Sequence, residues 1–500
     1  MLKRKPAITG LLVMLFNIGV ILNAFAQTQK TDWSGMVNNV PQWFEDAKFG
    51  IYFHLGPYSV PAFGTEWYSR NMYIPGTPEY KHHIETYGTL DKFGYKDFIP
   101  MFKAEHFNAD EWVDLFVKAG AKFAGPVAEH ADGFAMWKSK INPWNAYDMG
   151  PKRDFVGEME VAVRKRGLKF VTTFHHQWLW SWYPTFNKNV DAGNPEYSAF
   201  YGPVVSEAAW RYDEGAVDYR KPTVDFDKIW LAKTKEVIDA YHPDIIWFDN
   251  MLYSIPESYR KEFVTHYLND AKALHKQVAI IRKFNELPDE VSIENLEKAR
   301  KDKMAVKVWE TDETISTGSW SYVDGMQIRP AADMLYELID IVSKNGVLLM
   351  DISPKADGTI PDDQRNTLLG IGAWLKKYGQ AVYTTRPWYT FGEGPTEQPA
   401  GDFANADKFL KVKYTYNDIR YTTKGNIMFA ITLGRPPAGE TMLLTSFAKN
   451  KIPRTIKIRS IKILGSGETV KWKLADEGLS LTIPPNLPDG IANVFMIDTY

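Results

Sequence analysis

Between about residue 43 and residue 375, short apolar runs alternate with longer stretches whose apolar residues have helical spacing. Predicted strands cover residues 49–54, 122–127, 168–174, 244–248, 278–281, 305–308 and 346–350, and predicted helices cover 109–119, 156–166, 229–241 and 331–343. Apolar strands alternating with helices are typical of a parallel sheet covered by helices. About seven such units predict a (β/α)₈-like barrel with one degenerate unit. A dinucleotide-binding sheet is less well supported, because no G-x-G-x-x-G motif follows the first strand.

After about residue 385 the pattern changes to short β-type runs separated by Gly, Pro, Asn and Asp. These runs cover residues 409–416, 425–433, 441–447, 455–463, 469–474, 479–483 and 494–497. Short strands at regular intervals, without a helical stretch, predict an antiparallel β-sandwich. We therefore expect an α/β protein with a barrel domain at 27–385 and a C-terminal β-sandwich domain at 386–500.

The N-terminus has the three parts of a secretory signal. Residues 3–5 are cationic, residues 8–22 are mostly apolar, and the small residues Ala24 and Ala26 precede a cleavage point. The apolar run is shorter than the ~20 residues that a permanent membrane helix needs. The pattern predicts a signal peptide at 1–26 and a chain that is exported, to the periplasm or the medium, without stable membrane insertion after cleavage.

Composition excludes several classes of protein. Lys and Arg number 59 against 61 Asp and Glu, which gives a formal charge of −2 and argues against a nucleic-acid partner. The chain has no cysteine, so disulfides, thiolate metal sites and a cysteine nucleophile are excluded. The 17 Trp and 26 Tyr are many for 500 residues, and flat aromatic side chains favour, slightly, a protein that holds sugar rings.

Polar and aromatic residues stand where the predicted barrel strands end. In such barrels the C-terminal ends of the strands face the active site. The residues at or near these points are His54, Glu66, Trp67, Glu129, His130, His175, His176, Trp247, Asp249, Arg282, Trp309 and Glu310. Several strand ends therefore supply an imidazole, a guanidinium or a carboxylate, some of them beside a tryptophan.

Asp249 is the strongest catalytic candidate, because it follows the apolar strand at 244–248 directly. It could simply cap the next helix. As a catalyst it would act as a nucleophile toward a sugar's anomeric carbon, which develops oxocarbenium character. Neither H-E-x-x-H nor H-x-H is present, and the adjacent His175 and His176 point to opposite sides of a strand, so we expect no metal and no cofactor.

Several motifs in order resemble glycoside hydrolase family 29, the α-L-fucosidases. They lie at residues 43–56, 58–61, 66–68, 132–134, 150–154, 243–249, 309–311 and 345–361. The similarity covers about residues 40–385. The resemblance implies a retaining, exo-acting enzyme that hydrolyses terminal α-L-fucosyl residues from glycans by double displacement. It also implies a (β/α)₈-like catalytic barrel followed by a β-sandwich, and a fucosylated oligosaccharide or glycoconjugate as the partner.

The resemblance also implies roles for single residues. Asp249 falls on the nucleophile, and Trp320 matches an aromatic residue that packs against the sugar's methyl group. The residues that the resemblance and the strand-end positions together suggest for binding the sugar are His54, Glu66, Trp67, His130, His175, Trp247, Arg282 and Trp320. Glu297 is the first choice for the acid/base, Glu294 the second and Glu310 the third. Glu294 and Glu297 are three residues apart, on what we expect to be one helical turn.

Two departures from the family leave alternatives open. The chain has Ala131 where the family carries a second histidine, and His175-His176-Gln177 where the family carries Tyr-Tyr-Ser. A glycosidase for a related sugar, such as an α-L-galactoside, and a catalytically inactive sugar-binding homologue therefore remain the alternatives to a fucosidase.

Overall fold

The computed structural model describes residues 33–399, 401, 406–452 and 456–500, and residues 38–500 form one compact unit. The predicted signal peptide at 1–26 lies outside the described residues. Among the helices of this described part of the chain, none is long and apolar enough to cross a membrane.

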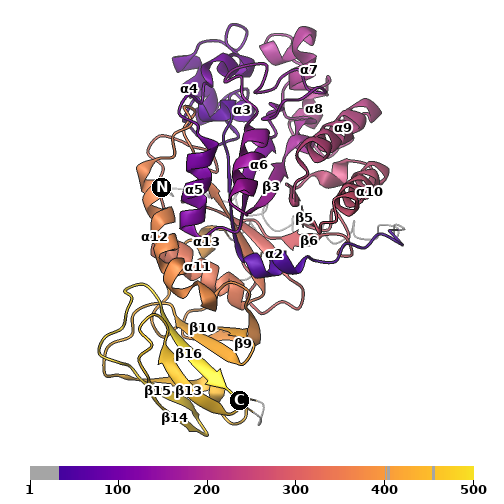
Figure 1. Cartoon of the computed structure of the whole chain (residues 1–500). Helices are drawn as coiled ribbons and strands as arrows, with labels where there is room; N and C mark the ends of the chain where they lie inside the picture. Colours follow the sequence, from indigo (N-terminus) through magenta and orange to yellow (C-terminus); the bar gives the residue numbers. More distant parts are fainter. Residues whose placement is uncertain (1–32, 400, 402–405, 453–455) are drawn as a thin grey trace, which may run out of the picture. The chain divides into compact units, whose positions relative to one another are not determined.

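Eight parallel strands close into a barrel in the order of the sequence, which confirms the predicted fold class (Figure 1). The strands are β1 (Phe49–Phe53), β2 (Phe123–Glu129), β3 (Lys169–Phe174), β4 (Ile245–Phe248), β5 (Ala279–Lys283), β6 (Ile293–Asn295), β7 (Trp309–Thr314) and β8 (Gly346–Ile352). Tyr52, Val171 and Trp247 belong to the buried core that fills the barrel. The C-terminal ends of all eight strands consequently meet at one rim.

Helices follow the strands, and their ends are fixed by local signals. Asn108 caps α5, because its side chain accepts a hydrogen bond from the Glu111 amide, and Gly120 ends the helix with a φ of 96°. The longer helices are α4 (Pro78–Thr86), α5 (Ala109–Ala119), α6 (Phe155–Lys165), α9 (Val224–Tyr241), α10 (Glu257–Ala273), α11 (Ala331–Ser343) and α12 (Asp362–Tyr378). The shorter ones are α2 (Gln42–Ala47), α3 (Tyr68–Asn71), α7 (Ser198–Tyr201), α8 (Glu207–Trp210) and α13 (Ala406–Phe409).

Two barrel strands differ from the prediction. Residues 305–308 form no strand, and β7 begins at Trp309 instead. The three-residue strand β6 was not predicted, and it is the degenerate unit. In β7 the sequence Trp-Glu-Thr-Asp-Glu-Thr has a polar residue at five of six positions although all six are buried, so it lacks the apolar signal of a buried strand. Glu294 lies within β6, so it shares no helical turn with Glu297.

The C-terminal part forms two antiparallel sheets, as predicted. One has the order β13-β16-β11-β10-β9 and the other β12-β15-β14. The strands are β9 (Arg386–Glu393), β10 (Ile419–Lys424), β11 (Ile427–Thr432), β12 (Thr441–Leu444), β13 (Ile458–Ile463), β14 (Lys471–Ala475), β15 (Gly478–Thr482) and β16 (Asn493–Thr499). Side chains from both sheets share one core, which makes a sandwich.

Three details of the sandwich correct the prediction. Strands β9 and β10 were not predicted, and the expected strand at 409–416 is absent, since the helix α13 reaches Phe409 and no strand follows before β10. The expected strand at 425–433 contains a turn, because Gly425 has a φ of 59° and connects β10 to β11.

A buried ion cluster joins α11 to the sheet that contains β10. Asp340 of α11 receives the Arg420 guanidinium at 2.5 Å and the Lys344 ammonium at 2.8 Å, and all three side chains are buried. Burial by itself would raise the pKa of Asp340, but Lys344 and Arg420 hold that pKa well below its usual value. The carboxylate therefore compensates two buried cations.

Asp340→Asn should lower the free energy of unfolding by about 3–5 kcal/mol, because it leaves two buried cations without their counter-charge. Urea unfolding at neutral pH measures this loss. The control is Asp333→Asn on the same helix, which removes an exposed pair with Lys413 and should cost no more than about 1 kcal/mol. Equal losses in the two variants would show that the buried cluster carries no special share of the stability.

Candidate active site

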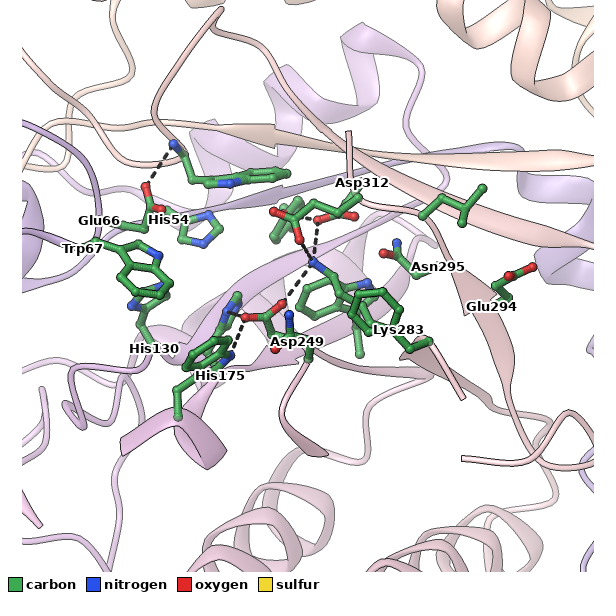
Figure 2. Close-up of a pocket in the computed structure, with 18 residues that line it drawn as sticks. His54, Glu66, Trp67, His130, His175, Asp249, Lys283, Glu294, Asn295 and Asp312 are labelled. Atoms are coloured by element: carbon green, nitrogen blue, oxygen red, sulfur yellow. Dashed lines mark hydrogen bonds and ion pairs between the residues drawn. The ribbon is translucent and has the colours of Figure 1, made fainter. Parts of the chain in front are cut away.

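A cavity of about 520 Å³ opens at the C-terminal rim of the barrel (Figure 2). It is lined by Tyr52, His54, Glu66, Trp67, His130, His175, Trp178, Trp247, Asp249, Asn250, Lys283, Phe284, Glu294, Asn295, Leu296, Glu297, Asp312 and Trp320. Strands β1 to β7, or the residues that directly follow them, all contribute. Its volume is typical of a site for a small ligand.

The structure brings ten of the predicted site residues into this cavity. They are His54, Glu66, Trp67, His130, His175, Trp247, Asp249, Glu294, Glu297 and Trp320. They come from positions up to 266 residues apart along the chain (54 to 320), and only closure of the barrel collects them.

Arg282 is the predicted sugar-binding residue that the structure leaves outside the cavity. Its guanidinium pairs with Asp289 and the Phe284 carbonyl, while the next residue, Lys283, lines the cavity. Successive side chains of a strand point to opposite faces, so only one of the two can face the barrel interior. The same alternation turns Glu129 away from His130, toward Lys233 of α9, and His176 away from His175, toward Trp230.

Asp249 sits directly after β4 and is held by three neighbours. Its carboxylate lies 3.0 Å from the Lys283 Nζ, accepts a hydrogen bond of 2.8 Å from the Trp178 indole, and lies 3.4 Å from the His175 Nδ1. Burial by itself would raise the pKa of Asp249, but Lys283 and His175 hold that pKa well below its usual value. Asp249 is therefore a fixed, ionised carboxylate.

Glu297 follows β6 and contacts the same ammonium, because Lys283 donates a hydrogen bond to it. Burial raises the pKa of Glu297 to about 7, with Asp312 and Asp249 adding to the rise and Lys283 opposing it. The next residue, Lys298, has a φ of 45°, and its amide donates to the Asp312 carbonyl. That strained turn fixes the direction in which Glu297 leaves the strand.

The other two carboxylate candidates have different surroundings. Glu294 is directed to the Lys301 ammonium at 2.8 Å, and Figure 2 shows it apart from Asp249 and Lys283. Glu310 is fully buried, does not line the cavity, and accepts a hydrogen bond from the Asn295 amide. Of the three glutamates, only Glu297 contacts the Lys283 ammonium, which also contacts Asp249.

The opposite wall of the cavity combines imidazoles with a glutamate and tryptophans. Asp351 holds the Nδ1 of His54 at 2.8 Å, and burial together with the neighbouring His175 and His130 keeps the pKa of His54 well below its usual value. The Glu66 carboxylate accepts a hydrogen bond from the Trp320 backbone amide. This bond connects the loop after β1 to the loop after β7. This wall offers both polar groups and flat apolar faces.

Lys283 and Asp312 are site residues that the sequence analysis missed. The carboxylate of Asp312 lies 3.8 Å from the Lys283 Nζ and accepts a hydrogen bond of 3.3 Å from the Tyr52 hydroxyl. Asp312 lies in β7, whose position was predicted wrongly. For Lys283 the only usable signal is the alternation along β5, and it is ambiguous because Ile280 and Ile281 are both apolar and both buried.

At neutral pH the site therefore contains the ionised carboxylate of Asp249 and the carboxyl group of Glu297, which is about half protonated. Two carboxyl groups whose pKa values are pushed apart are the usual arrangement for a nucleophile or base and a general acid.

The chain is similar to known proteins along most of its length. A family model described as Alpha-L-fucosidase matches residues 20–380. The chain is 28% identical to tissue alpha-L-fucosidase of Homo sapiens over 508 residues, which cover 99% of this chain and 97% of that protein. It is 27% identical to the alpha-L-fucosidase of Dictyostelium discoideum, with 89% of each chain covered.

Among solved structures, the alpha-fucosidase of Thermotoga maritima in complex with fucose superimposes with a TM-score of 0.72 at 29% identity, over 92% of this chain and 97% of that one. The chain described here therefore belongs to the alpha-L-fucosidase family and is a glycoside hydrolase.

Proposed function

We propose that this protein hydrolyses terminal α-L-fucosyl residues of glycans with retention of configuration, with Asp249 as the nucleophile and Glu297 as the acid/base. The assignment rests on one observation, which is that the Lys283 ammonium contacts the carboxyl groups of both Asp249 and Glu297. It contacts one carboxylate with a strongly lowered pKa and one carboxyl group with a pKa of about 7. The membership of the family supports the choice of sugar.

The reaction has two displacements. In the first, a carboxylate oxygen of Asp249 bonds to C1 of the sugar, the bond from C1 to the glycosidic oxygen breaks, and the Glu297 proton passes to that oxygen. In the second, Glu297 removes a proton from water, the water oxygen bonds to C1, and the ester to Asp249 breaks. Each displacement inverts C1, so the released fucose keeps the configuration of the substrate.

The separation of the two carboxyl groups agrees with this chemistry. Two oxygens that bind one ammonium nitrogen lie at most about 6 Å from each other. Retaining glycosidases place their two carboxyl groups about 5–5.5 Å apart, whereas inverting ones need room for a water between them. The shared contact with Lys283 therefore favours retention.

The other side chains that line the cavity suit a 6-deoxy sugar. Fucose has three ring hydroxyls other than the anomeric one, and we assign them to the imidazoles of His54, His130 and His175 together with Glu66. The C5 methyl group needs an apolar surface, which Trp320 and Trp67 supply.

A fluorinated sugar tests the assignment. A 2-deoxy-2-fluoro-α-L-fucosyl donor with a good leaving group should accumulate the covalent intermediate, since the fluorine slows the second displacement. Digestion and mass spectrometry should then find the label on the peptide with Asp249. A label on another peptide, or inverted fucose seen by NMR during hydrolysis of an aryl α-L-fucoside, would contradict the proposal. Faster turnover of the matched α-L-galactoside would assign a different sugar.

Lys283→Met should lower kcat/KM about 10²-fold and move both limbs of its pH profile to higher pH. The ammonium lowers the pKa of Asp249 and opposes the rise of the pKa of Glu297, so its loss raises both values. The measurement is kcat/KM for an aryl fucoside across the pH range. The neighbouring variant Arg282→Lys, outside the cavity, should keep the wild-type profile. A Lys283→Met profile that does not shift would show that the ammonium leaves these two pKa values unchanged.

We further infer that the chain is exported, on the strength of the N-terminal pattern alone. N-terminal sequencing of the protein recovered outside the cytoplasm should begin at Gln27. A recovered chain that still begins at Met1 would contradict the inference.

A further inference from the structure

Three histidines from three different strands converge in the cavity. His54 follows β1, His130 follows β2 and His175 follows β3, and Figure 2 shows them on one side of the site. Their ring centroids lie 4.7 to 5.5 Å apart, and one nitrogen of each ring lies within 4.8 Å of the other two. All three side chains are buried. No two of them are close in the sequence, so no local sequence motif indicates the cluster.

The rings have nitrogens available for a ligand. The Nε2 atoms of His54 and His175 and the Nδ1 of His130 have no hydrogen-bond partner in the structure. The Nδ1 of His54 lies 2.8 Å from the Asp351 carboxylate, and the Nδ1 of His175 lies 3.4 Å from that of Asp249. A carboxylate that receives Nδ1–H leaves a lone pair on Nε2 and fixes the ring, which is the usual support of a metal-binding histidine.

The charge of the cavity also favours a cation. Its lining includes five carboxyl groups and one ammonium, those of Glu66, Asp249, Glu294, Glu297, Asp312 and Lys283. Imidazole nitrogen selects ions such as Zn²⁺, Co²⁺, Ni²⁺ and Cu²⁺, whereas Mg²⁺ and Ca²⁺ prefer oxygen ligands.

We propose that His54, His130 and His175 form an inhibitory site for a divalent transition-metal ion. Nitrogens about 2.0–2.1 Å from a tetrahedral zinc lie about 3.4 Å from one another, and the nitrogens here lie within 4.8 Å of one another, so the rings need to close by at most about 1.4 Å. A water takes the fourth position, because the Asp249 carboxylate lies on the Nδ1 side of the His175 ring.

The consequence for activity rests on the proposed function, whereas the metal site itself does not. We assign the same three imidazoles to sugar hydroxyls, so an ion and a fucosyl group exclude each other. The ion therefore acts as a reversible competitor of the substrate, and a chelator restores activity.

Cobalt binding tests the metal site without reference to catalysis. The full chain, without a polyhistidine tag and freed of metal by a chelator, is titrated with Co²⁺ while its visible absorption is recorded, and with Zn²⁺ in a calorimeter. We expect one ion per chain, the intense absorption of a low-coordinate cobalt site, and no response to Mg²⁺.

Variants locate the ion. His130→Gln and His175→Gln should each weaken binding at least ~100-fold, since even loss of an outer partner of a ligand costs 10–100-fold. The exposed His275 provides the control His275→Gln, which should bind like the wild type. Thermal unfolding of each variant shows that it is folded, and two independent ligand variants protect the test against one that is not. Absence of a stoichiometric ion in the wild type, or full affinity in folded His130→Gln and His175→Gln, overturns the metal site.

Competition with L-fucose then separates the two proposals. Displacement of bound Co²⁺ by excess fucose, together with competitive inhibition by Zn²⁺, supports the inhibitory role. Cobalt that stays bound in saturating fucose overturns that role and the assignment of these imidazoles to sugar hydroxyls, while the metal site stands. A wild-type protein that binds no cobalt but shows normal fucosidase kinetics overturns the metal site and leaves the proposed function intact.

Discussion

Asp249→Ala should reduce kcat/KM for an aryl α-L-fucoside by at least about 10⁴-fold, which corresponds to about 5.5 kcal/mol of lost transition-state stabilisation. The variant removes the atom that bonds to C1, and no other carboxylate in the cavity replaces it. In the proposed mechanism Glu297 is needed as the acid, and the buried Asp312 carboxylate lies 3.8 Å from the Lys283 Nζ. Steady-state kinetics with an unchanged circular dichroism spectrum measures the effect.

Adding azide to Asp249→Ala gives a second measurement, because the small anion can enter the space left by the Asp249 side chain. It then attacks C1 from the face that the carboxylate used, so the expected product is the β-L-fucosyl azide, with inverted configuration. NMR of the product reads the configuration directly. Activity of Asp249→Ala within a factor of ten of the wild type would remove Asp249 from the mechanism.

Glu297→Ala should reduce the hydrolysis of a glycan or a poorly activated fucoside by about 10²–10⁴-fold, the usual contribution of a general acid. A substrate with a good leaving group needs little proton donation, so its first displacement should be largely preserved and the glycosyl-enzyme should accumulate. Azide then attacks this ester at C1, and the product is the α-L-fucosyl azide, with retained configuration. The two variants are therefore distinguished by opposite anomers of the same compound.

The pH profile gives a second readout of Glu297. With its pKa raised to about 7, the group is protonated below that pH and ionised above it. Wild-type kcat/KM for a fucoside that needs the acid should therefore fall above about pH 7, and Glu297→Ala should lose this alkaline limb. The matched control is Glu294→Ala, which removes a carboxylate paired with Lys301 and should keep both the rate and the limb. Loss of the limb in Glu294→Ala instead would move the acid/base to Glu294.

For the histidine cluster, the sequence predicted the single residues but not their arrangement. Strand-end positions identified His54, His130 and His175 individually, because barrel strands present their last residues to one rim. They did not show that the three rings converge. Metal motifs such as H-E-x-x-H are local, whereas this cluster depends on the pairing of β1 with β2 and of β2 with β3.

The sequence by itself determined the class of fold, the family and the position of Asp249, because each depends on patterns within a short stretch of chain. Alternating apolar strands and amphipathic helices specify a barrel, and an apolar strand that ends in a carboxylate specifies a rim residue. Only the tertiary structure showed that Lys283 lines the cavity and that Arg282 does not. Likewise, only the tertiary structure showed that, of Glu297, Glu294 and Glu310, Glu297 contacts the ammonium that also contacts Asp249. Strands of a closed parallel barrel are buried on both faces, so their hydrophobic pattern does not reveal which side chains point inward. The pKa values that separate a nucleophile from an acid arise from groups brought together by the closure of the barrel.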